Sequence, residues 1–64
     1  MAYLGQRISG RNILNRDQQT AIDGRLRNMH PSYVGFEVIG EDEIFIHYSD
    51  GGWRTASISG TLRI

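Results

Sequence analysis

The sequence has 64 residues, seven arginines and no lysine against seven acids, a formal net charge of zero, and no cysteine. A domain this small has a core that supplies only roughly 3 to 5 kcal/mol, and disulfides are excluded as a further source of stability, so self-association or a partner remains. No apolar run reaches the roughly 20 residues of a membrane span, and Met1 to Gly10 lacks the pattern of a secretory leader, so we expect a cytoplasmic protein (in the host cytoplasm if phage-encoded) without membrane contact.

We treat residues 1–64 as a single small domain whose first twelve residues are the most ambiguous part. Leu4 and Ile8 fit one face of a short strand, whereas Gly5 and Gly10 weaken it. We therefore expect residues 1–12 to form either an arm or an edge strand.

A helix is predicted from Arg16 to Met29. Asn15 is a favoured N-cap, Gln18 stands three residues later as in a capping box, and Pro31 disfavours helical geometry at the residue before it. Gly24 lies inside the helix and weakens it, so tertiary support or a close neighbouring backbone is expected there. One apolar stripe recurs at helical spacing: Ala21, Ile22, Leu26 and Met29.

The spacing of apolar residues then changes to two, which predicts three strands over 33–39, 43–49 and about 53–64, with a possible break at Gly60. One parity of these strands forms the core face: Val34, Phe36, Val38, Ile44, Ile46, Tyr48, Ala56, Ile58, Leu62 and Ile64.

Three-residue loops at 40–42 and 50–52 align the strong apolar positions. They pair Val38 with Ile44, Phe36 with Ile46, Ile44 with Ile58 and Ile46 with Ala56, with Gly52 as the left-handed residue of the second loop. The predicted fold is α+β, with one helix packed on an antiparallel three-stranded meander and an N-terminal edge strand as an option.

The opposite face of this predicted sheet is too aromatic to lie wholly in water. We predict a partner or oligomer interface there, formed by Tyr33, Ile39, Phe45, His47 and Trp53. Three interpretations stay open: self-association, coverage by residues 1–13, and a site for an external ligand. The first half of the chain carries a formal charge of +3 and the second half −3, which would orient a second copy or a charged partner, or would simply decorate a solvated surface.

The residue types give little support to catalysis. His47 near Thr55 or Glu37 is a conceivable acid–base pair, but a lone histidine on a strand is more typical of a surface. His30 and His47 are far apart and have no thiolate partners, so we expect no metal site, no cofactor and no enzymatic activity.

We therefore predict a small non-enzymatic binding protein, oligomeric, of the accessory or inhibitory type found in phages and mobile elements, that acts by protein–protein contact. The alternative is a nucleic-acid or nucleotide-binding module in which Arg25, Arg27 and Arg54 contact phosphates beside the strand aromatics. A sequence pI of about 6.7 argues against that alternative, because domains that bind phosphates are usually basic.

Overall fold

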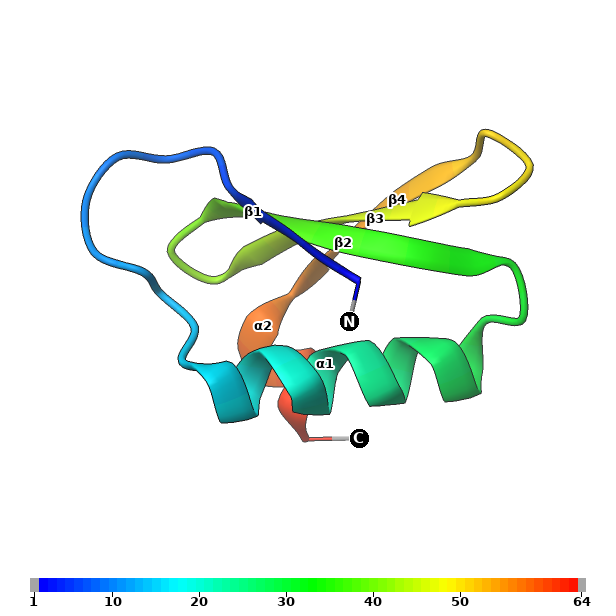
Figure 1. Cartoon of the computed structure of the whole chain (residues 1–64), viewed down its shortest axis with the longest axis horizontal. Coiled ribbons are helices and arrows are strands. Elements are labelled where there is room, and N and C mark those ends of the chain that lie inside the picture. The colour runs from blue at the N-terminus through cyan, green and yellow to red at the C-terminus, as the bar shows by residue number, and fades with distance from the viewer. Residues whose placement is uncertain (1, 64) are drawn as a thin grey trace.

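The computed structural model describes residues 2–63, which form a two-layer α+β arrangement. A four-stranded sheet in the order β1-β2-β3-β4 forms one layer, and both helices pack on the same side of it (Figure 1). The elements are β1 (Tyr3–Gln6), α1 (Arg16–Met29), β2 (Tyr33–Gly40), β3 (Glu43–Tyr48), β4 (Trp53–Ser57) and α2 (Ile58–Leu62). The α+β prediction is confirmed, but the chain has a second helix and a mixed sheet.

Helix α1 begins and ends where the local signals indicate. The Asn15 side chain accepts a hydrogen bond from the backbone of Gln18, and the Gln18 side chain accepts one from the backbone of Asn15, which completes the predicted capping box. The helix ends at Met29, and His30 already has extended geometry.

The N-terminal segment supplies the edge strand that we left as an option. Strand β1 lies parallel to β2, with Tyr3 beside Phe36 and Gln6 beside Val38, while β2, β3 and β4 form the expected antiparallel meander. The sheet is therefore mixed rather than purely antiparallel. Parallel pairing joins segments about 30 residues apart, which no local pattern in the chain reveals.

The start of β2 contradicts our assignment of faces. The pairs Phe36 with Ile46 and Val38 with Ile44 are confirmed, but the register shifts between Tyr33 and Gly35. This irregularity turns Tyr33 toward the helices, where it is only 6% exposed, and leaves Val34 50% exposed. The predictions that Tyr33 faces outward and that Val34 lies in the core are therefore wrong.

The last hairpin keeps the predicted parity but shifts by two residues. Ile44 pairs with Ala56 and Ile46 with Arg54, rather than with Ile58 and Ala56. The loop is residues 49–51, because the Tyr48 amide donates to the Gly52 carbonyl, and Gly51, not Gly52, has the positive φ of 86°. The Asp50 side chain accepts from the Gly52 amide at 2.8 Å and holds this turn.

The third predicted strand ends at Ser57 instead of continuing toward residue 64. Ser57 caps α2 by accepting from the Gly60 amide, and Asp42 accepts from both the amide and the hydroxyl of Ser59. These polar contacts favour a helix over a longer strand. Ile64, assigned to the core face from the sequence, lies outside the described residues.

The core lies between the sheet and the helices. Its buried apolar members are Leu14, Ile22, Leu26, Tyr33, Phe36, Val38, Ile44, Ile46 and Ile58. Within the described residues both helices lie on this side, and no helix packs on the opposite side of the sheet, which we call the outer face (Figure 1). Within residues 2–63 no helix has the length and apolar character to cross a membrane.

Candidate functional site

The outer face carries the side chains that alternate away from the core. By strand parity and contacts its members are Leu4, Gly35, Glu37, Ile39, Glu43, Phe45, His47, Trp53, Thr55 and Ser57. Arg7, the residue that follows β1, extends over the same face. The face combines an aromatic cluster on β3 and β4 with a polar row that begins beside β1.

An aromatic pair is the most exposed apolar feature of this face. The rings of Phe45 and Trp53 stack with their centroids 5.4 Å apart and an interplanar angle of 17°. They lie diagonally across the β3–β4 ladder, because Trp53 pairs with His47 and Phe45 pairs with Thr55. Trp53 is 66% exposed, so most of the largest side chain of the protein faces solvent.

A polar row crosses the face beside the aromatic pair. Arg7 donates from Nε to Glu37 Oε2 at 2.9 Å, and its Nη2 lies 2.9 Å from Glu37 Oε1. His47 Nε2 lies 2.9 Å from the same Oε1 atom and donates to it, because an ionised carboxylate only accepts. The hydrogen bond from His47 and then the contacts with Arg7 lower the pKa of Glu37, which outweighs the opposing effect of burial.

The polar row and the aromatic pair are physically continuous. The guanidinium carbon of Arg7 lies 5.8 Å from the centroid of the Phe45 ring, within the range of a cation–π contact. The His47 ring also contacts Phe45, with centroids 4.8 Å apart. Glu37 therefore holds Arg7 and His47 against the ring of Phe45, and the exposed indole of Trp53 stacks on that ring in turn.

The N-terminal segment covers part of the outer face and reaches Phe45 through Arg7, but it leaves Trp53 66% exposed. A Cβ atom at Gly35 would lie 3.0 Å from the Ala2 carbonyl oxygen and 3.1 Å from the Leu4 side chain. The N-terminal segment therefore approaches β2 closely at Gly35. The Gln6 side chain bonds to backbone atoms of Ile8, Arg11 and Ile13 and fixes the loop that follows. The predicted coverage by residues 1–13 is thus limited to the β1–β2 side and to the Arg7 side chain, which reaches Phe45 on β3.

The structure brings together most of the interface residues that we predicted. Phe45, His47 and Trp53 form one cluster, and Ile39 is half-buried two residues beyond Glu37. Tyr33 is the exception, because its ring lies in the core and its hydroxyl donates to Asp23 Oδ1 at 2.7 Å. Tyr33 lies in the strand that we predicted, but the register irregularity between Tyr33 and Gly35, which the alternation of residue types does not indicate, reverses its face.

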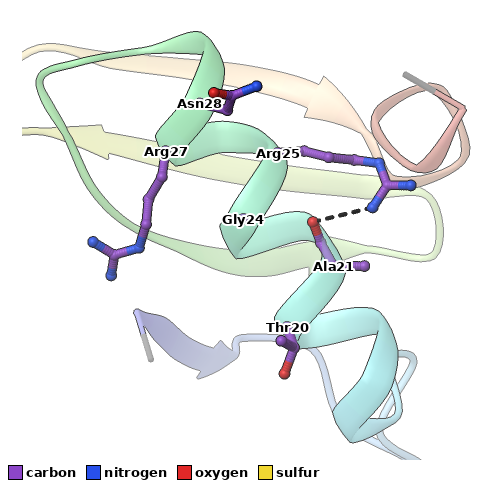
Figure 2. Close-up of a pocket in the computed structure, with 6 residues that line it drawn as sticks. All are labelled: Thr20, Ala21, Gly24, Arg25, Arg27 and Asn28. Atoms are coloured by element: carbon purple, nitrogen blue, oxygen red, sulfur yellow. Dashed lines mark hydrogen bonds between the residues drawn. The ribbon is translucent and has the colours of Figure 1, made fainter.

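The three arginines of the alternative hypothesis do not lie with the aromatic pair. Arg25 and Arg27 belong to α1, on the other side of the sheet, and extend to either side of Gly24 along a shallow groove of the helix (Figure 2). Arg27 bonds to Asp23 at 3.1 Å, and Arg25 donates to the Ala21 carbonyl at 3.3 Å. Arg54 pairs with Ile46, whose side chain is in the core, so it lies on the helix side.

Arg7 is the residue of this site whose role the sequence does not reveal. It stands 30 residues from Glu37, and only the parallel pairing of β1 with β2 brings the two together. No pattern within the first ten residues signals that contact. The proximity of His47 to Glu37, by contrast, follows from the register of the β2–β3 hairpin.

The outer face brings together a carboxylate, an imidazole and a guanidinium in one hydrogen-bonded row beside two stacked rings. Glu37 and His47 form an oriented pair on this face, whereas the two grooves described for the chain lie along α1 and between the helices and β4. Among residues 2–63 no group of three or more His, Cys, Asp or Glu side chains is placed to hold a metal ion. Comparison with known proteins adds no family, because the chain matches no protein-family model, no curated protein and no solved structure.

Proposed function

We propose that this chain is a non-enzymatic protein-binding module that contacts its partner through the outer face of the sheet. The observation that carries the proposal is the stacked Phe45–Trp53 pair, in which the indole is 66% exposed on a face with no helix over it. Tryptophan is among the residue types most enriched at the hot spots of protein interfaces. The module acts by occupying a surface, as an accessory or inhibitory protein does.

The charge of the face favours a protein partner with a neutral, apolar patch. Arg7 is the cation of the polar row, and the carboxylate of Glu37 at 2.9 Å balances it. Such an ion pair has no net charge, so it attracts a charged partner only weakly. It offers directional hydrogen bonds at the rim of the interface, beside the aromatic anchor. The partner chemistry that fits is an aliphatic or methionine side chain over Trp53, surrounded by polar groups that meet Arg7 and His47.

The placement of the arginines weighs against a nucleic-acid partner. Nucleic-acid binding requires cations around the stacking aromatics so that phosphates are neutralised. Arg25, Arg27 and Arg54 lie on the helix side of the sheet, and Arg27 is already engaged with Asp23. A strand of nucleic acid stacked on Trp53 would meet none of these three side chains.

A photo-crosslinking experiment in the native host tests the proposal. Benzoylphenylalanine replaces Trp53 in one variant and Asn28, an exposed residue of α1, in the matched control. We expect a discrete crosslinked protein from position 53 that excess unmodified chain displaces, and no such product from position 28. Crosslinks of equal yield from both positions, crosslinks only to nucleic acid, or no displaceable product from position 53 would overturn the proposal.

A further inference from the structure

The two edges of the sheet differ in how they are protected against pairing. The outer edge of β1 belongs to a strand of four residues that is irregular in register and contains Gly5 at a φ of 112°. Strand β4 pairs with β3 without any register shift, contains no proline, and has one charged residue, Arg54. Edge strands in stable monomers are commonly protected by a bulge, a proline, a short length or charges, and β4 has only its length of five residues and Arg54, so its edge is the better suited of the two to pairing.

The hydrogen-bond phase of the β3–β4 ladder shows which backbone groups point outward. The Tyr48 amide donates to the Gly52 carbonyl at one end, and the Ile58 amide donates to the Asp42 carbonyl at the other. Bonded pairs alternate in an antiparallel ladder, so Arg54 and Ala56 bond to β3. The amides of Trp53, Thr55 and Ser57 therefore point away from the sheet, toward the open edge.

We propose that β4 pairs with β4 of a second copy, antiparallel, about a two-fold axis at Thr55. The amide of each Thr55 donates to the carbonyl of Thr55 of the partner subunit. The amide of each Ser57 donates to the carbonyl of Trp53 of the partner subunit. The two four-stranded sheets then become one continuous sheet with a closed, isologous interface.

The side chains of β4 are self-complementary in this register. Trp53 stands opposite Ser57, Arg54 opposite Ala56 and Thr55 opposite itself, so each large side chain meets a small one. Each Arg54 stands directly opposite an alanine and only diagonally across the axis from Arg54 of the partner subunit, and a Thr–Thr pair is a favourable cross-strand combination. A second copy fits this edge better than an arbitrary strand, because the small residues needed opposite Trp53 and Arg54 are already present in β4 itself.

The helix side of the edge offers further surface for the same partner. A groove of about 200 Å³ lies between β4 and both helices, with lining residues that include Leu26, Met29, Arg54, Ala56 and Thr61. Met29 is 42% exposed there, although it belongs to the apolar stripe of α1. Arg54 and Ala56 of the partner subunit would lie beside this groove, so pairing buries apolar surface as well as backbone groups.

The pairing stands independently of the proposed function. On the outer face it places the Trp53 ring beside Ser57 of the partner subunit and brings the two aromatic pairs onto one surface. A dimer with a doubled outer face can contact a partner twice. The dimer depends on backbone hydrogen bonds of β4, whereas partner binding depends on the indole of Trp53. Either proposal can therefore be wrong while the other is right.

Amide hydrogen exchange measured by NMR over a protein dilution series tests the pairing without any mutation. At concentrations where light scattering reports a dimer, we expect the amides of Thr55 and Ser57 to exchange at least tenfold more slowly than in the monomer. The amides of Arg54 and Ala56 bond to β3 in both states and serve as the internal control. A chain that stays monomeric up to about 1 mM, or a dimer in which the Thr55 amide exchanges as in the monomer, would overturn the proposal.

A pair of variants tests the same interface by mass. Thr55→Pro removes the outward amide and no bond to β3, whereas Thr55→Val keeps the amide and the branched side chain. We expect the proline variant to be a folded monomer and the valine variant to be a dimer. A folded proline variant that remains a dimer overturns the proposal, and if that variant does not fold, the exchange measurement on the unmodified chain decides.

Discussion

The hydroxyl of Tyr33 donates a hydrogen bond to Asp23 Oδ1 at 2.7 Å, and both residues are buried. Burial alone would raise the pKa of Asp23, but the hydrogen bonds from Tyr33 and Arg27 lower it below its usual value of 3.8. Burial and then the neighbouring carboxylate raise the pKa of Tyr33, so its hydroxyl stays protonated as a donor. This contact fastens the start of β2 to the middle of α1.

Removing that donor should destabilise the fold at neutral pH. In Tyr33→Phe the buried Asp23 carboxylate loses a hydrogen bond, so we expect the free energy of unfolding to fall by about 1 to 3 kcal/mol. Because the pKa of Asp23 is lowered in the folded protein, its stabilisation is present above about 3.8 and is lost as the pH falls through the folded value. Urea unfolding at pH 7 and pH 3 should therefore show a smaller effect of Tyr33→Phe at the lower pH.

The control for this variant is Tyr3→Phe. Tyr3 packs against Phe36 with ring centroids 5.5 Å apart, so the substitution keeps the ring and removes a hydroxyl that is not engaged with a buried carboxylate. We expect a change within about 0.5 kcal/mol. Equal losses in the two variants would show that the Tyr33–Asp23 contact does not contribute to stability.

Gly24 lies in the interior of α1 without a structural need for glycine. Its φ is not positive, and a Cβ atom there would meet nothing within 4 Å. We expect Gly24→Ala to stabilise the protein by about 0.5 to 1 kcal/mol, because glycine costs that much in a helix interior. Thermal unfolding followed by circular dichroism measures the change.

The matched comparison is Gly51→Ala in the last hairpin. Gly51 has a φ of 86°, where an alanine is strained by about 1 to 2 kcal/mol. The two substitutions should move the melting temperature in opposite directions. If Gly24→Ala destabilised the protein, a Cβ atom at this position would have to clash with another group, although none lies within 4 Å of it.

Glu37 makes the stability of the outer face depend on pH. Its pKa is lowered from 4.5 by His47 and Arg7, so its contribution is present above about 4.5 and disappears as the pH falls through the lower folded value. Glu37→Gln should therefore unfold more easily at pH 7 and should lose less stability than the parent between pH 7 and pH 3. Urea unfolding at both pH values measures this difference.

Glu41→Gln serves as the control for that charge removal. Glu41 is exposed at the tip of the β2–β3 hairpin, so its replacement changes a carboxylate to an amide outside the polar row. We expect it to keep the pH dependence of the parent protein. If Glu37→Gln also keeps the full pH dependence, the ion pair with Arg7 and the bond to His47 do not stabilise the fold.

The sequence was most informative where structure is decided by neighbours along the chain. Asn15, Gln18 and Pro31 define α1 through contacts within a few residues, and alternation fixes the pairing of Phe36 with Ile46. The same alternation correctly predicts that three of the proposed interface residues share one face of the sheet, namely Phe45, His47 and Trp53. Local propensity and periodicity suffice for such features.

The predictions failed where a distant contact decides between two locally acceptable structures. Tyr33 turns inward because Asp23, ten residues away, accepts its hydroxyl proton in a hydrogen bond. Ile58 and Leu62 are four residues apart, a spacing that fits a strand of even parity as well as a helix, and the bonds from Ser59 to Asp42 favour the helix. The contact of Arg7 with Glu37 depends on a parallel pairing that alternation cannot reveal.

The measurement that tests the central claim most directly is a titration of the protein identified by crosslinking at position 53. It compares the parent chain with Trp53→Ala and with Asn28→Ala, at low and moderate salt. If the outer face is the binding surface, Trp53→Ala weakens affinity at least about 30-fold, Asn28→Ala changes it less than about twofold, and salt has little effect. Unchanged affinity of a folded Trp53→Ala variant, or affinity that collapses with salt in the parent chain, would contradict the claim.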